Sequence, residues 1–142
     1  MIKNIPKDTR YFHYYNANPK GIRAADCAIR ALSLALNQTW EDTLQGLTDV
    51  ALKCKRDPTE PDTIAKYLNQ KGWIKQPQPK HLDGTKYTGK QFIDARIESR
   101  VIICNIGTQH MSVITGGKFY DTWDPSDYTV GNYWCFNDMC DR

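Results

Sequence analysis

The sequence predicts an α+β domain whose helices come first and whose antiparallel sheet follows. Three observations support this prediction: apolar residues recur at helical spacing between residues 27 and 70, a β-branched run fills residues 100–106, and two alternating runs flank Gly116 and Gly117. Helices followed by hairpin-connected strands are typical of α+β proteins. With 142 residues, of which 40% are apolar, the chain suits one domain over residues 1–142.

The first helix is expected over about residues 27–36. The preceding "NANPKG" favours a turn, and Asp26 stands where a helix needs an N-cap. The segment "CAIRALSLAL" is apolar on nearly every side, which is typical of a buried central helix. We therefore place this helix at the centre of the helical half.

Three more helices are expected before the sheet. Thr39, with Asp42 three residues later, resembles a capping box with a shorter acid and predicts a helix over about 40–55. Pro61 suits a first helical position and Gly72 suits a stop, which predicts a third helix between them. Residues 88–98 allow a short fourth helix, and "KQPQPKHLDGTKY" (75–87) is expected to be a surface loop within one fold.

The sheet is expected from residue 100 onward. "RVIICNI" (100–106) predicts a buried strand, and "HMSVITGGKFYDTW" (110–123) predicts a hairpin closed by the two glycines. "YTVGNYWCF" (128–136) supplies a further strand. His110 is then the only histidine on a predicted strand.

Charge and hydropathy give no support for two kinds of partner. The formal net charge is +3, but the lysines are scattered and no Lys/Arg-rich tract or nucleic-acid motif occurs, so no nucleic-acid partner is expected. No run approaches the roughly 18 apolar residues of a membrane-spanning helix, so no membrane partner is expected either.

The cysteines favour a reducing compartment. Their number is odd, their spacing is irregular, and no apolar leader follows Met1, so we expect reduced thiols and a cytoplasmic protein. A structural zinc site usually has two close cysteine pairs, whereas only one loose pair, Cys135 and Cys140, is present, so no metal is expected. The five cysteines are Cys27, Cys54, Cys104, Cys135 and Cys140.

Cys27 is the first candidate for chemistry. It lies in the first turn of the predicted apolar helix, where unpaired amides and the helix dipole stabilise a thiolate, the reactive form of cysteine. Buried inert cysteines are common, so two interpretations stay open at this point: a reactive thiol, or a residue that fills space. A partner base is needed to decide between them.

His110 is the histidine best placed to be that base. A base must be held rigidly near its nucleophile, and His110 opens the predicted hairpin. His13 belongs to an aromatic N-terminal stretch and His81 to the Pro-rich loop, and both are expected to face solvent.

Two aspartates compete to orient His110. If the hairpin loop has two residues, Ser112 faces Asp121, which places Asp121 diagonal to His110 on one face of the hairpin. A three-residue loop would shift the register and bring Asp124 opposite His110 instead. The glycine pair favours Asp121, and Asp124 stays open as the alternative.

The order cysteine, histidine, aspartate, with helices before the sheet, resembles the papain-like cysteine peptidase superfamily, including its compact NlpC-like and bacteriocin-processing relatives. The segments that carry the resemblance are "DCAIRAL", "QHMSVI" and "FYDTWDP". The chain is also similar to small papain-like proteins encoded by bacterial viruses and their hosts, through an "NPKG…DC.IRAL" start and a "GNYW" finish. The resemblance spans about Tyr14 to Trp134.

The resemblance implies a catalytic triad. In it, Cys27 would be the nucleophile, His110 the base that deprotonates it, and Asp121 or Asp124 the group that orients the imidazole. Such a triad needs no cofactor.

The oxyanion hole is where the chain departs from that pattern. Papain-like enzymes often carry a glutamine a few residues before the cysteine, whereas this chain has Gly21 six residues upstream. Asn18 or Asn16 is the expected substitute, with the Cys27 backbone amide as the other donor.

The function implied is a cysteine hydrolase, either a peptidase or an amidase, that forms an acyl-enzyme on a peptide or protein substrate. The same triad also supports deamidation or non-hydrolytic acyl transfer. The alternative is a non-catalytic papain-like binding protein of viral origin that acts on a host protein or a nucleotide signal. The reactivity of Cys27 separates the two, because a pure binder does not need a lowered thiol pKa.

Overall fold

The computed structural model describes residues 5–96 and 100–137, and over these residues the chain folds as four helices and six strands. The helices are α1 (Cys27–Ala35), α2 (Trp40–Cys54), α3 (Pro61–Gln70) and α4 (Gly89–Arg96). The strands are β1 (Phe12–Tyr14), β2 (Trp73–Gln76), β3 (Ile102–Ile106), β4 (His110–Thr115), β5 (Lys118–Asp121) and β6 (Val130–Phe136).

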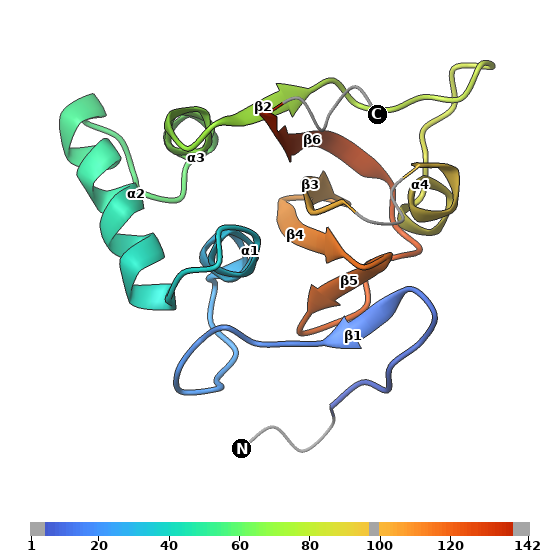
Figure 1. The fold of residues 1–142 in the computed structure, drawn as a ribbon, viewed down its shortest axis with the longest axis horizontal. Coiled ribbons are helices and arrows are strands. Elements are labelled where there is room, and N and C mark those ends of the chain that lie inside the picture. The colour runs from blue at the N-terminus through green and yellow to red at the C-terminus, as the bar shows by residue number, and fades with distance from the viewer. Residues whose placement is uncertain (1–4, 97–99, 138–142) are drawn as a thin grey trace.

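The strands form one sheet in the order β1-β5-β4-β3-β6-β2. Strand β1 pairs with β5 in parallel, and every other pair of neighbours in this sheet is antiparallel. Figure 1 shows the sheet from β2 at the top to β1 at the bottom, with α1 to α3 on one side and α4 on the other. The predicted α+β class, with N-terminal helices packed on a mostly antiparallel sheet, is confirmed.

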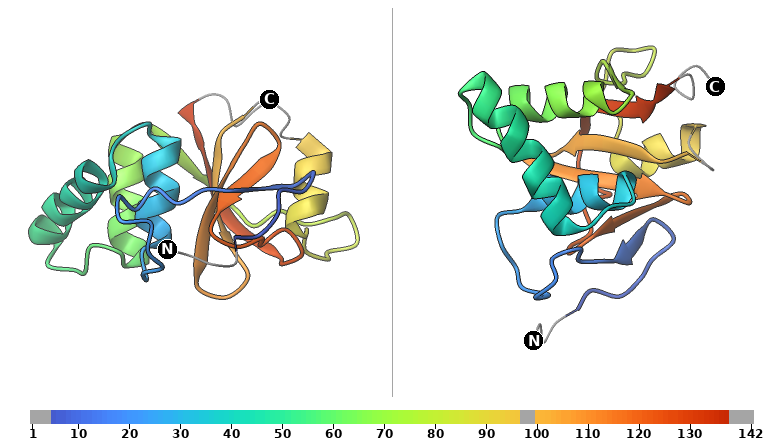
Figure 2. Two further views of the ribbon diagram at one scale, coloured as in Figure 1. Left: turned by 90° about the horizontal axis from the view of Figure 1, so that it is seen from below. Right: turned by 60° about the vertical axis from the view of Figure 1, so that its left-hand side comes forward.

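The sheet lies between α1 to α3 on one face and α4 on the other (Figure 2), and an apolar core fills each side. Helices α1, α2 and α3 pack against one face through Leu32, Leu47, Leu68, Ile103 and Trp134. Helix α4 packs with the other core, which contains Phe12, Phe92, Ile102, Phe119 and Val130. Helix α1 is the helix that lies against β4, so its first residue comes to the edge of the hairpin.

The predicted helices lie where the sequence places them. The Thr39 hydroxyl accepts a hydrogen bond from the Asp42 amide at 3.0 Å and caps α2, and Pro61 is the first residue of α3. Helix α1 begins at Cys27 with Asp26 at its N-cap position, but the Asp26 side chain makes no capping bond, so the expected cap is wrong in that respect. The last two residues of the predicted fourth helix, 97–98, lie outside the described residues.

Two short strands are absent from the prediction. Strand β1 has three residues, too few for alternation to be detected, and the long segment between it and β5 permits their parallel pairing. Strand β2 overlaps the segment predicted to be a loop and pairs with β6 at the sheet edge. Both strands are specified by their partners rather than by their own periodicity.

The hairpin has the predicted register. Gly116 and Gly117 have φ angles of 59° and 75°, and Thr115 pairs with Lys118. Positive φ at both central residues is the requirement of a type I′ turn, which glycine meets without strain. The two-residue loop is therefore confirmed, and with it the alternation that places His110, Ser112 and Asp121 together.

The described helices include none that is long and apolar enough to cross a membrane. Cys27, Cys54 and Cys104 are free thiols, whereas Cys135 is in a disulfide. The expectation that every thiol is reduced is therefore wrong at Cys135, and the cytoplasmic location remains a prediction.

Candidate active site

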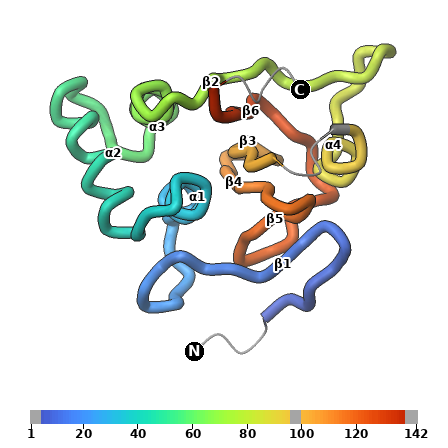
Figure 3. Tube along the Cα trace, viewed as in Figure 1, coloured from blue at the N-terminus to red at the C-terminus, as the bar shows by residue number. Residues whose placement is uncertain are grey.

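Cys27 is the first residue of α1, and the chain reaches it through a loop that leaves β1 and turns back toward the helix (Figure 3). The Asp26 carboxylate does not cap the first turn, because it is turned toward other partners. The amide groups at the start of α1 therefore keep no side-chain cap. The positive end of the helix remains available to negative charge on Cys27 or on a group bound beside it.

The imidazole of His110 is held by Asp121. Its Nε2 lies 2.7 Å from Asp121 Oδ2, and both side chains are largely buried. Since Asp121 occupies Nε2, the other ring nitrogen, Nδ1, is the one left to serve Cys27. An orienting carboxylate of this kind fixes both the tautomer and the direction of a catalytic imidazole.

The Cys27 thiol receives hydrogen bonds from two groups of β4. Burial by itself raises the pKa of Cys27, but hydrogen bonds from the His110 side chain and the Met111 amide outweigh it, so the pKa lies below its ordinary value. The positive charges of His110 and Arg30 act in the same direction. The thiol is thus set up to ionise more easily than a free cysteine.

His110 is shifted in the complementary direction. Burial by itself lowers the pKa of His110, but hydrogen bonds to Asp121 and to Cys27 outweigh it and raise the pKa to about 9. A lowered thiol pKa beside a raised imidazole pKa favours a thiolate–imidazolium ion pair at neutral pH.

Asp121 is held by more than His110. Ser112 donates its hydroxyl to Asp121 Oδ2 at 2.6 Å, and the Thr122 amide donates to Oδ1 at 2.7 Å. Arg30 from α1 donates to Oδ1 at 3.5 Å. The carboxylate therefore has partners on both oxygens, as a buried carboxylate needs.

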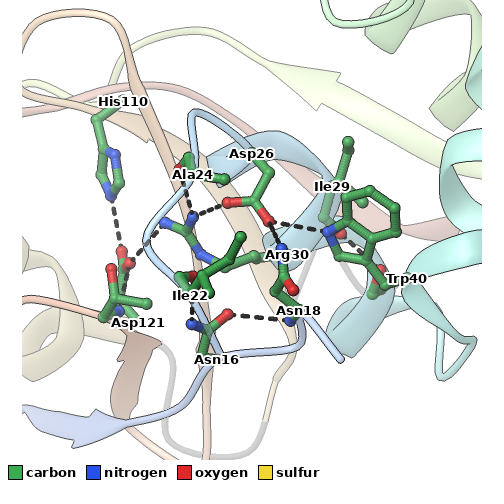
Figure 4. Close-up of polar contacts among 12 residues, drawn as sticks. Asn16, Asn18, Ile22, Ala24, Asp26, Ile29, Arg30, Trp40, His110 and Asp121 are labelled. Carbon is green, nitrogen blue, oxygen red and sulfur yellow. Dashed lines mark hydrogen bonds and ion pairs between the residues drawn. The ribbon is translucent and has the colours of Figure 1, made fainter. Parts of the chain in front are cut away.

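Arg30 links the start of α1 to the hairpin, and the sequence analysis assigned it no role. It is buried, forms an ion pair with Asp26, and reaches Asp121 with its other guanidinium nitrogen. Asp26 in turn accepts from Trp40 Nε1 at 2.9 Å (Figure 4). One signal was present in the sequence: an arginine inside an otherwise apolar helix must find a buried partner.

Trp123 covers the imidazole. Its ring centroid lies 4.6 Å from that of His110 at a tilt of 45°, and its other side meets Tyr128 edge-on at 5.5 Å. The prediction that His110 faces Trp123 across the hairpin agrees with this contact. The indole therefore packs on the imidazole whose Nε2 is bonded to Asp121.

Asp124 does not reach His110 in the structure. Its Oδ1 accepts from the Ser126 amide at 2.9 Å, so the side chain closes the turn that follows β5. The two-residue hairpin loop leaves Asp121 beside His110, and of the two open alternatives only Asp121 has the required contact.

The expected oxyanion-hole residues are placed elsewhere. Asn18 donates its amide to Asp26 at 3.1 Å, and Asn16 donates to the Ile22 carbonyl at 3.0 Å (Figure 4). Neither side chain lines the clefts beside Cys27. Their amides make hydrogen bonds within the segment before α1 instead, and their expected role as oxyanion donors stays a prediction.

The remaining histidines lie apart from the site. His13 is on β1, so the statement that only His110 lies on a strand is wrong; its Nδ1 lies 2.6 Å from Asp8. His81 stacks on Tyr87 at 3.8 Å between ring centroids. Neither is fully solvent-facing, but neither approaches Cys27.

Two clefts meet at Cys27. The first, here the Lys75 cleft, has a volume of about 310 Å³ and is lined by Ile64, Lys75, Met111 and Trp134. The second, here the Arg23 cleft, has a volume of about 490 Å³ and is lined by Arg23, Ala24, Thr122 and Trp123. Both clefts also contain Cys27, Ala28, Thr59, Gln109 and His110.

The other free thiols differ from Cys27. Cys104 is fully buried, and burial raises its pKa far above the ordinary value. Cys54 lies at the end of α2, where Lys66 contacts its sulfur at 3.5 Å. Within residues 5–96 and 100–137, no group of three or more His, Cys, Asp or Glu side chains is arranged to hold a metal ion.

No family model, curated protein or solved structure matches the chain.

Proposed function

We propose that this protein is a papain-like cysteine hydrolase in which Cys27, His110 and Asp121 form the catalytic triad. The observation that carries the proposal is the hydrogen-bonded pair of Cys27 and His110, in which the thiol pKa is lowered and the imidazole pKa is raised. The chain order and the helix-before-sheet arrangement that resemble papain-like enzymes support it.

The proposed reaction cleaves an acyl bond in two steps. The Cys27 thiolate attacks the substrate carbonyl carbon, and His110 gives its Nδ1 proton to the leaving amine as the carbon–nitrogen bond breaks. The acyl group is then bonded to Cys27 sulfur. His110 next takes a proton from water, the hydroxide attacks the carbonyl carbon, and the sulfur–carbon bond breaks to regenerate the thiolate.

The oxyanion that forms in each step needs donors. The Cys27 backbone amide lies at the uncapped start of α1 and supplies one. Gln109 supplies the second in our proposal, because it lines both clefts beside Cys27 and carries a side-chain amide that can donate. Gln109 also has a φ of 55°, an unusual backbone conformation that functional positions often keep.

The Lys75 cleft and the Arg23 cleft together form a groove that suits a peptide or protein substrate. The two clefts leave Cys27 and His110 at their junction, so an extended chain passing through both would place a backbone or side-chain amide against the sulfur. The same geometry accepts the side-chain amide of glutamine, in which case the product is a deamidated protein.

The first test is the rate at which iodoacetamide alkylates Cys27 between pH 4 and 9, followed by peptide mass spectrometry with Cys54 as the internal reference thiol. We expect Cys27 to react faster than Cys54 below pH 7 and to lose that advantage in His110→Ala. If Cys27 reacts no faster than Cys54, the triad does not operate and the binding-protein alternative gains support.

The second test measures turnover. Wild type and Cys27→Ser are incubated with a mixed peptide library, and mass spectrometry records new termini and the mass increase of glutamine deamidation. We expect one of these products with wild type and neither with Cys27→Ser, while Cys54→Ser, the matched control, retains activity. A product that also forms with Cys27→Ser excludes Cys27 as the nucleophile.

A further inference from the structure

The two clefts at Cys27 carry positive charge without carboxylates. Lys75 lines the first cleft and Arg23 lines the second, and none of the described residues lining either cleft is Asp or Glu. Arg30 also lines the second cleft, but Asp26 and Asp121 neutralise it. The two cations available to a bound molecule are therefore Lys75 and Arg23.

Lys75 and Arg23 have no ion-pair partner among residues 5–96 and 100–137. Both side chains are exposed. Other exposed cations do have partners: Arg56 pairs with Glu60, and Lys90 pairs with Asp127. Lys75 and Arg23 thus differ from paired surface charges of this protein.

Apolar side chains line the cleft beside the Lys75 ammonium. Its ammonium lies 5.6 Å from the centre of the buried Trp134 ring, and Ile64 and Met111 line the same cleft. Apolar walls lower the local dielectric and strengthen the attraction between a bound anion and the ammonium. A side chain with a short apolar stem and a carboxylate end matches this combination.

The catalytic pair does not cancel this positive charge. A thiolate and an imidazolium together carry no net charge, so Lys75 and Arg23 remain the charges without an opposite charge among the residues that line the two clefts. A basic substrate would place its own cation beside them without a carboxylate to receive it, which is unfavourable.

We infer that the groove selects acidic peptides, with glutamate or aspartate side chains beside the carbonyl that Cys27 attacks. Lys75 and Arg23 are the specificity residues. This inference rests on the proposed hydrolase function, since it assigns the substrate class of the same site.

The test uses probes that report recognition through a covalent bond. Tripeptidyl acyloxymethyl ketones carry Glu, Gln or Lys at the two positions nearest the ketone. The Cys27 sulfur displaces the probe's carboxylate leaving group from the carbon next to the ketone, and a sulfur–carbon bond forms. Labelling rates at Cys27 are measured by mass spectrometry at pH 7.

We expect the Glu probe to react about fivefold faster than the Gln probe, because an ion pair exposed to solvent changes a rate by about that factor. The Lys probe should be the slowest. High salt should reduce the difference, because both cations are exposed. The double variant Lys75→Gln/Arg23→Gln should react equally with all three probes, and each single variant shows how much its cation contributes.

Lys71→Gln is the matched control. Lys71 is also an exposed lysine over an aromatic ring, 5.5 Å from the centre of Tyr67, but it does not line either cleft at Cys27. The Lys71→Gln variant removes one positive charge, as Lys75→Gln does, and it should keep the preference for the Glu probe. Equal rates for the Glu and Lys probes in wild type, or a preference that persists in the double variant, would overturn the inference.

Iodoacetamide separates failure of this inference from failure of the proposed function. If iodoacetamide labels Cys27 selectively at pH 7 while the three peptide probes react equally, the hydrolase proposal stands and the acidic preference is wrong. If iodoacetamide shows no selectivity for Cys27, the hydrolase proposal itself is wrong.

Discussion

Opposed effects on a single thiol decide what Cys27 can do. Burial disfavours its charged form, as it does for Cys104, and Cys104 receives no compensating hydrogen bond. At Cys27 the imidazole of His110 and the amide of Met111 reverse the result. The same residue type therefore has a lowered pKa at one position and a raised pKa at the other, and two donors from β4 make the difference.

The Asp121→Asn variant tests the orienting carboxylate. Loss of its negative charge should lower the pKa of His110 from about 9 toward the ordinary 6.5, because the hydrogen bond to Asp121 is the largest influence raising it. An NMR titration of His110 measures this pKa directly. Any hydrolysis rate should fall by roughly 10²–10⁴-fold, the usual contribution of a positioned proton-transfer group.

Asp124→Asn is the control for that experiment. Asp124 accepts a hydrogen bond from the Ser126 amide in the turn after β5, and asparagine can keep that turn. The His110 titration should therefore stay at about 9. A shift in Asp124→Asn equal to that in Asp121→Asn would mean that the triad assignment is wrong.

The β4–β5 hairpin brings His110 and Asp121 together through its turn. Both glycines have positive φ, and only a two-residue loop of this kind keeps Ser112 and Asp121 on the face that His110 occupies. A slip of one residue would turn Asp121 to the opposite face. The chemistry of the site thus depends on two residues that have no side chain.

Gly117→Val should therefore affect both stability and reactivity. A β-branched residue at a φ of 75° is strained, and we expect the free energy of unfolding to fall by about 1–3 kcal/mol, measured by urea denaturation. Selective alkylation of Cys27 should weaken as the register loosens. Gly116→Asn keeps a favoured Asn-Gly turn and should retain both properties.

Helix α1 and the hairpin are joined by Arg30. Its guanidinium contacts Asp26, the residue before Cys27, and Asp121, the carboxylate that is hydrogen-bonded to His110. The ion pairs are almost entirely buried, so the arginine neutralises two carboxylates that water does not reach. It acts as a positioning residue, since it touches neither Cys27 nor His110 through a hydrogen bond.

Arg30→Gln should destabilise the fold by about 3–5 kcal/mol, the usual effect of leaving a buried charge unpaired. The pH profile of Cys27 alkylation should shift as well, because Arg30 contributes to lowering that pKa. Urea denaturation and iodoacetamide kinetics measure the two effects. The double variant Asp26→Asn/Arg30→Gln should lose less stability than Arg30→Gln, and an additive loss would contradict the pairing.

Across the molecule, the sheet supports the site by holding two separate cores. Leu32 of α1 is fully buried between the helices and the sheet face that carries Val113 and Trp134. Because α1 carries Cys27 and the sheet carries His110, packing on this face sets the distance between them. The opposite core, with Phe92 and Phe119, supports the hairpin from behind.

Leu32→Ala should lower the free energy of unfolding by about 2–5 kcal/mol, through lost burial and a residual cavity. Leu52 is 63% exposed on α2, and Leu52→Ala should change stability by no more than about 0.5 kcal/mol. Urea denaturation compares the two variants. Equal effects would show that α1 does not form the centre of the core.

The helices and the hairpin could be predicted from the sequence because their signals are local. Thr39 and Pro61 start their helices, and the glycine pair sets the register that selects Asp121 over Asp124 at His110. Short-range signals of this kind depend on backbone geometry, which the neighbouring residues determine. The α+β class followed from these elements.

The partners of buried polar groups were decided only by the tertiary structure. Asn18 and Asn16 donate to the loop rather than to the site, and Arg30 bridges two elements, because each polar group that packing removes from water must find a partner wherever the fold provides one. The strands β1 and β2 likewise exist through their neighbours. The sequence by itself determined where Cys27, His110 and Asp121 lie along the chain; packing of α1 against β4 determined that they meet.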